Sequence, residues 1–141
     1  RQKLKALPQG VFGGVENGAY LLKESENAEF TLLASGIEVS LCLETSALLE
    51  QKGKRVSIIS MPCYELFERQ DKAYKKRLLQ GRVIGVEAAS ANEFYQFCDE
   101  VFGIKSFGES GKDKEVFAHF GFTPDRLCEF VLKADVCAFK A

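Results

Sequence analysis

Residues 30–39 read FTLLASGIEV, and this stretch decides the fold class. Residues 30–34 are almost entirely apolar, which is typical of a strand buried on both faces of a sheet. Ser35-Gly36 then supplies a turn, and from Ile37 onward apolar residues recur at helical spacing. A buried strand that passes through a tight turn into an amphipathic helix predicts the first half of a βαβ unit.

The flanking sequence continues this alternation of strands and helices. Besides the strand at 30–34, we expect strands at 18–23, 55–60, 82–88 and 104–107. We expect helices at 37–52, 64–67, 71–79, 92–101 and 113–120, and a last helix from Pro124 to about Lys133. This order predicts an α/β domain with a mainly parallel, doubly wound sheet and helices on both faces.

The composition is that of one globular domain. The chain has 141 residues, of which 46% are hydrophobic, and its net charge is −1. This length favours one domain with its own core, and the apolar content excludes an intrinsically disordered chain. The balanced charge excludes a general attraction to nucleic acid or to an anionic membrane, and the apolar runs are too short for a membrane span or a secretory signal. Because the sequence begins with Arg1 and its only Met is Met61, we expect a piece of a longer chain.

The cysteines favour a packing role. Their number is odd, and no CxxC or CxxH pair occurs, which excludes a zinc ribbon or a disulfide framework. Cys42, Cys98 and Cys128 lie in apolar stretches, where we expect small buried residues in a reducing, cytoplasmic compartment. Cys63 falls in a predicted loop, but a nucleophile needs a base, and the only histidine, His119, is far away in the sequence.

A doubly wound sheet binds its ligands beyond the carboxyl ends of its strands, where the strand order reverses. The residues at such ends are Ser35, Gly36 and Glu38 after one strand and Glu87 at the end of another. A helix N-terminus suits a phosphate, but Glu38 would repel one, and no glycine-rich phosphate motif is present. Glu87 is either an acid or base or a residue that holds a neighbouring loop. Structural roles are favoured for both carboxylates, and this crevice remains the candidate site.

Two other groups favour structural roles as well. His119 stands among phenylalanines, which favours a packing residue over a catalyst, and no metal-ligating set can be assembled from the sequence. The basic face of the helix at 71–79 is expected to be solvated or paired with nearby acids. The basic residues are Lys72, Lys75, Lys76 and Arg77, and the acids are Glu65, Glu68 and Asp71. The interleaved aromatic residues of a nucleic-acid surface are absent.

The order of these pieces resembles the C-terminal domain of transketolase over nearly the whole chain. Residues 34–39, ASGIEV, are similar to the A-S-G-x-E-V turn of that family. Further similar segments are Arg1-Gln2 with Leu7-Pro8, Gly18-Ala19-Tyr20, Arg55-Val56-Ser57, Ser60-Met61-Pro62 with Phe67 and Gln70, Val86-Glu87-Ala88, Phe107-Gly108-Glu109-Ser110, and Phe120-Gly121-Phe122-Thr123. Each motif alone is weak, but their common order is specific.

The resemblance implies a three-layer α/β/α fold around a mixed, mostly parallel five-stranded sheet with one antiparallel strand. It implies a linker from a preceding pyrimidine-binding domain at 1–17 and the C-terminal domain at 18–141. The parent enzyme would transfer a two-carbon ketol unit from a ketose phosphate to an aldose phosphate, using thiamine diphosphate and Mg²⁺ or Ca²⁺. The family holds these cofactors in domains that these residues do not include.

The resemblance therefore implies a structural, dimer-supporting domain that carries no catalytic residue and is inactive alone. The implied partners are the remaining transketolase domains, a second copy in a homodimer and sugar phosphates, with no nucleic acid and no membrane. One residue matches a functional position: Arg1 corresponds to the arginine that contacts the sugar-phosphate group in the intact enzyme, for which a guanidinium is suited.

Two other interpretations stay open. The chain could be the C-terminal domain of another thiamine diphosphate enzyme: dihydroxyacetone synthase, deoxyxylulose phosphate synthase or a 2-oxo acid dehydrogenase β chain. The start at Arg1-Gln2 and the stretch from Ser60 to Gln70 favour transketolase. The other alternative is a stand-alone α/β module that binds a small anion at Ser35-Gly36 and Glu87.

Overall fold

A five-stranded sheet is the centre of the fold. The computed structural model describes residues 10–87, 96–103 and 122–140. The strand order is β1-β3-β2-β4-β5, with β1 antiparallel to β3 and the other pairs parallel. The strands are β1 (Tyr20–Lys23), β2 (Phe30–Ala34), β3 (Val56–Ser60), β4 (Arg82–Glu87) and β5 (Glu100–Gly103). The predicted mixed, mostly parallel five-stranded sheet is thereby confirmed.

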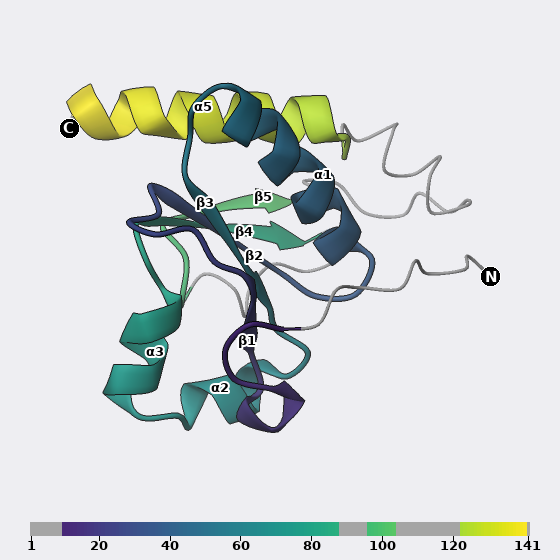
Figure 1. The fold of residues 1–141 in the computed structure, drawn as a ribbon, viewed down its shortest axis with the longest axis vertical. Helices are drawn as coiled ribbons and strands as arrows, with labels where there is room; N and C mark the ends of the chain where they lie inside the picture. Colours follow the sequence, from purple (N-terminus) through teal and green to yellow (C-terminus); the bar gives the residue numbers. More distant parts are fainter. Residues whose placement is uncertain (1–9, 88–95, 104–121, 141) are drawn as a thin grey trace.

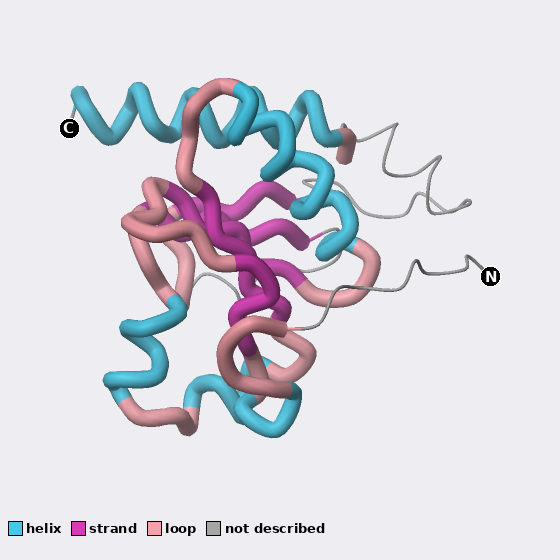
Figure 2. The backbone as a smooth tube through the Cα atoms, in the orientation of Figure 1, coloured by secondary structure: helices cyan, strands magenta, loops and turns pink. Residues whose placement is uncertain are grey.

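Helices cover both faces of this sheet, as Figure 1 shows. Helices α1 (Glu38–Gln51) and α5 (Pro124–Lys140) pack against each other on one face, and the short helices α2 (Tyr64–Glu68) and α3 (Lys72–Leu78) lie on the other. Figure 2 shows the strands as the middle layer between these two sets of helices. The three-layer α/β/α arrangement agrees with the expectation.

Side-chain alternation along the strands builds two cores, one on each face of the sheet. In β2, Phe30, Leu32 and Ala34 belong to the core shared with α1 and α5, whereas Leu33 belongs to the core shared with α2 and α3. All five residues of β2 are buried. This double burial is the physical reason for the nearly continuous apolar run in the sequence.

The structure corrects the prediction for residues 100–101. A helix was expected over 92–101, but residues 96–99 are not helical, and residues 100–101 form the start of β5, in which Val101 pairs with Gly85 of β4. The spacing of Phe97, Cys98 and Val101 suits a helix, but all three pack against the core formed with α2 and α3. Pairing with β4 therefore overrides the local pattern.

Other boundaries shift, and some predictions lie outside the described residues. Helix α5 continues to Lys140, past the expected end near Lys133. The segments at 92–95, 104–107 and 113–120 fall outside the part of the chain that the structure describes.

Residues 10–17, which were expected to be a linker, lie against the sheet, and we call them the N-terminal strap. The Val11 amide donates to the Leu21 carbonyl at 2.8 Å, and the Leu21 amide donates to the Phe12 carbonyl at 2.9 Å. The strap therefore covers part of the outer edge of β1, and it ends in a single 3-10 turn, η1 (Val15–Asn17).

Candidate functional site

The predicted crevice lies where strand order reverses, at the carboxyl ends of β2 and β4. Strands β3 and β4 flank β2 on opposite sides, so the connections that follow β2 and β3 leave the sheet in opposite directions. Ala34 pairs with Val86 in parallel register, which brings the next residues, Ser35 and Glu87, to the same edge of the sheet. Topology thus gathers residues that are more than fifty positions apart in the sequence.

The turn between β2 and α1 places a carboxylate at the positive end of the helix. Gly36 adopts φ +60°, a left-handed conformation that favours glycine, and α1 begins two residues later at Glu38. The Glu38 side chain is buried, with 7% of its surface exposed. A carboxylate in the first helical turn is stabilised by the helix dipole.

This arrangement places acidic residues at the edge where the candidate site is expected. Glu38 on the first turn of α1 and the half-buried Glu87 at the end of β4 contribute two carboxylates to one edge of the sheet. Two carboxylates at this edge disfavour a phosphate there. The stand-alone anion-binding module is accordingly not favoured. Among residues 10–87, 96–103 and 122–134, no group of three side chains from His, Cys, Asp and Glu could hold a metal ion.

Three cysteines of the described part, Cys42, Cys98 and Cys128, are packing residues rather than nucleophiles. Burial, and after it the charge of Glu38, raises the pKa of the Cys42 thiol far above its ordinary value. Burial and then Asp99 raise the pKa of Cys98 to about 12. Burial also raises the pKa of Cys128, which is buried against α1. A thiol held protonated in this way is inert.

Of the three remaining residues that the sequence singled out, the structure describes only Cys63. Cys63 is half-buried at the start of α2, in the loop where it was expected. Arg1 and His119 lie outside the described residues.

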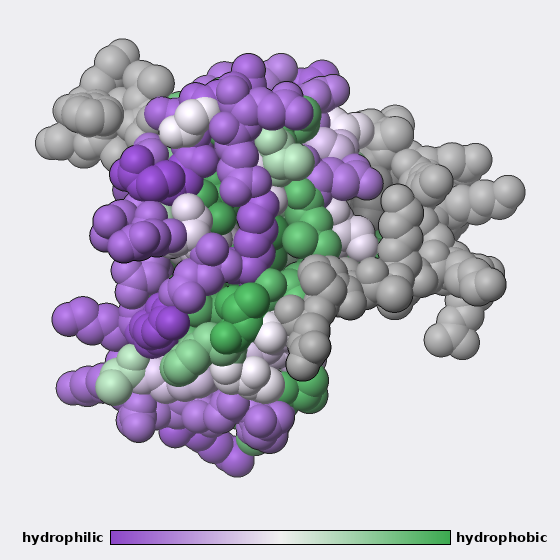
Figure 3. Space-filling model, in the orientation of Figure 1, coloured by the Kyte–Doolittle hydropathy of each residue, from purple (hydrophilic) through white to green (hydrophobic). Residues whose placement is uncertain are grey.

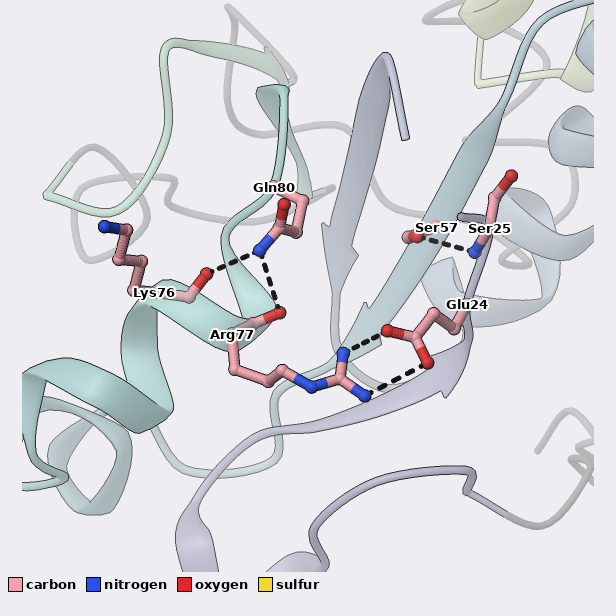
Figure 4. A network of polar contacts seen from close by, with 6 residues as sticks. All are labelled: Glu24, Ser25, Ser57, Lys76, Arg77 and Gln80. Carbon is pink, nitrogen blue, oxygen red and sulfur yellow. Dashed lines mark hydrogen bonds and ion pairs between the residues drawn. The ribbon is translucent and has the colours of Figure 1, made fainter. Parts of the chain in front are cut away.

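The basic helix α3 makes contacts that the sequence predicted only in part. Asp71 caps it, since its carboxylate accepts from the Tyr74 amide at 2.8 Å. Arg77, however, pairs with Glu24 from the loop after β1 and not with the nearby acids Glu65, Glu68 or Asp71 (Figure 4). The hydrogen bonds from Arg77 hold the pKa of the Glu24 carboxyl below its usual range.

Tyr74, on the same helix, fixes the strap. Its hydroxyl donates to the Ala19 carbonyl at 2.6 Å, and its ring stacks on Phe12 with the centroids 5.6 Å apart. This contact could not be predicted from the sequence, because it joins residues 55 and more positions apart and has no local period. The available signal was the presence of one phenylalanine, Phe12, and two valines, Val11 and Val15, among the glycine and polar residues of 10–17.

A surface groove between α1 and α5 was also not predicted. It carries charges of both signs beside apolar side chains. Its lining residues are Leu48, Gln51, Lys52, Asp125, Cys128, Glu129 and Leu132. No helix of the described part is both long and apolar enough to cross a membrane.

The fold defines the class of protein: a doubly wound α/β domain with an antiparallel edge strand and two glutamates, Glu38 and Glu87, at its switch point. Residues 18–123 match the model of the transketolase-like TK C-terminal domain. The chain belongs to the transketolase C-terminal domain family.

Similar proteins agree with this assignment. A crystal structure of transketolase from Campylobacter jejuni is 64% identical, with a TM-score of 0.90 over 94% of this chain and 21% of that one. Transketolase from Staphylococcus epidermidis is 40% identical over 93% of this chain. A transketolase structure from Pichia stipitis in complex with sedoheptulose 7-phosphate is 32% identical, with a TM-score of 0.81 over 90% of this chain and 20% of that one.

The matched region covers only part of these relatives. The chain spans about a fifth of their length, and it aligns to their C-terminal part. The relatives with these names are transketolases, which favours this family over the other thiamine diphosphate enzymes.

Proposed function

We propose that this chain is the C-terminal domain of a transketolase that transfers a two-carbon ketol unit from a ketose phosphate to an aldose phosphate. The observation that carries the proposal is the 64% identity and the TM-score of 0.90 to the transketolase of Campylobacter jejuni. The ligand named for the Pichia stipitis relative, sedoheptulose 7-phosphate, supports sugar phosphates as the substrate class.

In this proposal the cofactors are held elsewhere in the polypeptide. When bound, thiamine diphosphate would supply the nucleophilic carbon and the electron sink for the electron pair that is released when a carbon–carbon bond of the ketose breaks. Residues 10–87, 96–103 and 122–134 offer no set of three metal-ligating side chains from His, Cys, Asp and Glu for Mg²⁺ or Ca²⁺. In this proposal no catalytic step is assigned to the side chains of these residues.

The proposed role of the domain is structural. Its sheet is buried on both faces, and burial raises the pKa of the thiols of Cys42, Cys98 and Cys128, so these side chains are packing residues. We assign residues 1–17 to the connection with a preceding pyrimidine-binding domain and 18–141 to the domain itself. We also propose a homodimeric, cytoplasmic parent enzyme that binds neither nucleic acid nor membranes, for which the net charge of −1 is suitable.

Arg1 is the one residue to which we assign a substrate contact. Its guanidinium would donate parallel hydrogen bonds to the phosphate of the sugar in the intact enzyme. In the complete polypeptide, Arg1→Gln should raise the KM for a phosphorylated ketose about tenfold or more and leave the KM for a ketose without phosphate nearly unchanged. Arg69→Gln, at an exposed arginine, is the matched control. If Arg1→Gln changed the KM for both substrates equally, the assignment of Arg1 to the phosphate would be contradicted.

The activity itself is tested on the complete polypeptide that contains this sequence. Loaded with thiamine diphosphate and Mg²⁺, it should transfer the ketol unit from xylulose 5-phosphate to an aldose phosphate. The 141-residue chain alone should show no transfer under the same conditions. Transfer by the 141-residue chain, or the lack of it in the complete polypeptide, would contradict the proposal.

A further inference from the structure

Exposed apolar side chains gather at one place on the described part of the molecule. The large hydrophobic residues that are exposed there are Val11 (58%), Phe12 (37%), Val15 (62%) and Leu66 (38%). Three of the four belong to the N-terminal strap, and the fourth is on α2, which contacts the 3-10 turn of the strap. Figure 3 shows hydrophobic residues at the surface over β1 and beside α2. We call these four residues the strap patch.

The strap patch is held in place by hydrogen bonds and ring contacts. The Asn17 side chain accepts from the Gly14 amide at 3.1 Å and donates to the Gln70 side chain at 3.2 Å. Phe12 is stacked on Tyr74. A patch that is already ordered loses little conformational entropy when a partner covers it.

The position of the patch in the chain indicates what covers it. The patch begins at Val11, next to the point at which preceding polypeptide would enter the domain. Because the chain spans about a fifth of its relatives and aligns to their C-terminal part, a parent of their length has about four fifths of its residues before this point. A covalently attached neighbour reaches a high effective concentration, so a small apolar patch suffices to dock it.

We propose that the strap patch is the docking surface for the part of the same polypeptide that precedes this domain. The docking fixes the orientation of the domain on the rest of the enzyme through Val11, Val15 and Leu66. This inference rests on the proposed function only in that the chain must belong to a longer polypeptide.

The test places a photo-reactive benzoylphenylalanine at Leu66 of the complete polypeptide. Irradiation and peptide mapping by mass spectrometry should give cross-links to residues that precede Arg1. The same probe at Ala47, an exposed residue of α1 on the opposite layer, is the matched control and should give few such cross-links. Mixing isotope-labelled and unlabelled subunits distinguishes cross-links within one chain from those between two copies.

A variant tests whether the docking depends on the patch. Val15→Asp combined with Leu66→Asp should increase the hydrogen-exchange rate of peptides covering 11–17 and 64–68 in the complete polypeptide about tenfold or more. Ala47→Asp, which adds one acid elsewhere, should leave those rates unchanged. A circular dichroism spectrum unlike that of the parent would show misfolding, and in that case the cross-linking result decides.

The outcomes separate this inference from the proposed function. Cross-links to a second copy, cross-links only within residues 10–140, or exchange rates equal in all variants would overturn the docking proposal. A polypeptide that cross-links as expected but transfers no ketol unit would contradict the proposed function and leave the docking standing.

Discussion

The guanidinium of Arg77 lies over the ring of Phe12, with its central carbon 4.5 Å from the ring centroid. The same guanidinium pairs with Glu24, and the ring of Tyr74 stacks on Phe12. Helix α3 thus holds both the strap and the loop after β1 through two residues one turn apart. These contacts therefore fix the N-terminal strap, residues 10–17, to the rest of the domain.

Phe12 should contribute to stability more than its exposure suggests. Phe12→Ala removes the ring contact with Tyr74 and the cation–π contact with Arg77, and we expect the free energy of unfolding to fall by about 1–2 kcal/mol. Urea denaturation followed by circular dichroism measures this change. Val11→Ala, at the more exposed neighbour, should cost under about 0.5 kcal/mol. Equal losses from both variants would contradict the role of the ring contacts.

The hydroxyl of Tyr74 should stabilise the start of β1. Tyr74→Phe keeps the ring but leaves the Ala19 carbonyl without this donor, which should cost about 1 kcal/mol in the free energy of unfolding. Burial and then the charge of Glu16 raise the pKa of this phenol, so it remains a donor at neutral pH. The measurement is the same urea titration, with Tyr20→Phe as the control. A loss within error of zero would mean that water replaces the hydroxyl.

The Glu24–Arg77 pair predicts a pH dependence. The pKa of Glu24 is lowered from 4.5 by the hydrogen bonds from Arg77, so the unfolded state binds the proton more readily. The stability from this pair is present above pH 4.5 and is lost as the pH falls through the lowered pKa. Glu24→Gln should therefore slightly decrease the urea midpoint at neutral pH, and this difference should shrink in acid. Both side chains are partly exposed, so the effect is small and screened by salt.

Glu26→Gln, at an exposed glutamate of the same loop, controls for the loss of one negative charge. A difference between Glu24→Gln and the parent that persists unchanged in acid would show that the ion pair is not its source.

Thiol labelling should distinguish Cys42 from Cys63. Cys42 is completely buried and its pKa is raised, whereas Cys63 is half-buried at the start of α2. In the folded protein, iodoacetamide should modify Cys42 at least ~100-fold more slowly than Cys63, as followed by mass spectrometry. In denaturant the two rates should become similar. Rapid labelling of Cys42 in the native state would contradict its burial.

Two glycines with positive φ should differ in their sensitivity to alanine. At Gly36, with φ +60°, an added Cβ meets only the Glu38 carboxylate at 3.6 Å, so Gly36→Ala should cost about 1 kcal/mol for the left-handed backbone alone. At Gly81, with φ +63°, it would lie 2.5 Å from the Ala28 carbonyl oxygen. Gly81→Ala should therefore lower the thermal midpoint clearly more than Gly36→Ala. The reverse order would contradict the close approach at Gly81.

Two kinds of sequence feature made parts of the fold predictable: the apolar pattern within one segment and the order of the strands and helices. The bounds of β2 were predicted to the residue, because burial on both faces produces an apolar run between polar ends. The gathering of Ser35 and Glu87 at one edge followed from the parallel connection rules, which depend on element order alone.

The parts that were missed depend on contacts between distant residues. The start of β5 was expected to be helical, and its pairing with β4 is what makes Glu100 and Val101 a strand. The partner of Arg77 is 53 residues away, so sequence distance pointed to the wrong acids. No periodicity in residues 10–17 indicates that Phe12 meets Tyr74.

The bridge between Phe12 and Leu21 has a practical consequence for producing this domain. Strand β1 is at the edge of the sheet, and the strap occupies the amide and carbonyl of Leu21 that would otherwise face outward. A version cut at Gly18, where the family match begins, would leave that edge open to pairing with other chains, which is a common route to aggregation. A recombinant form that starts at or before Gly10 should therefore stay monodisperse at concentrations at which the shorter form precipitates.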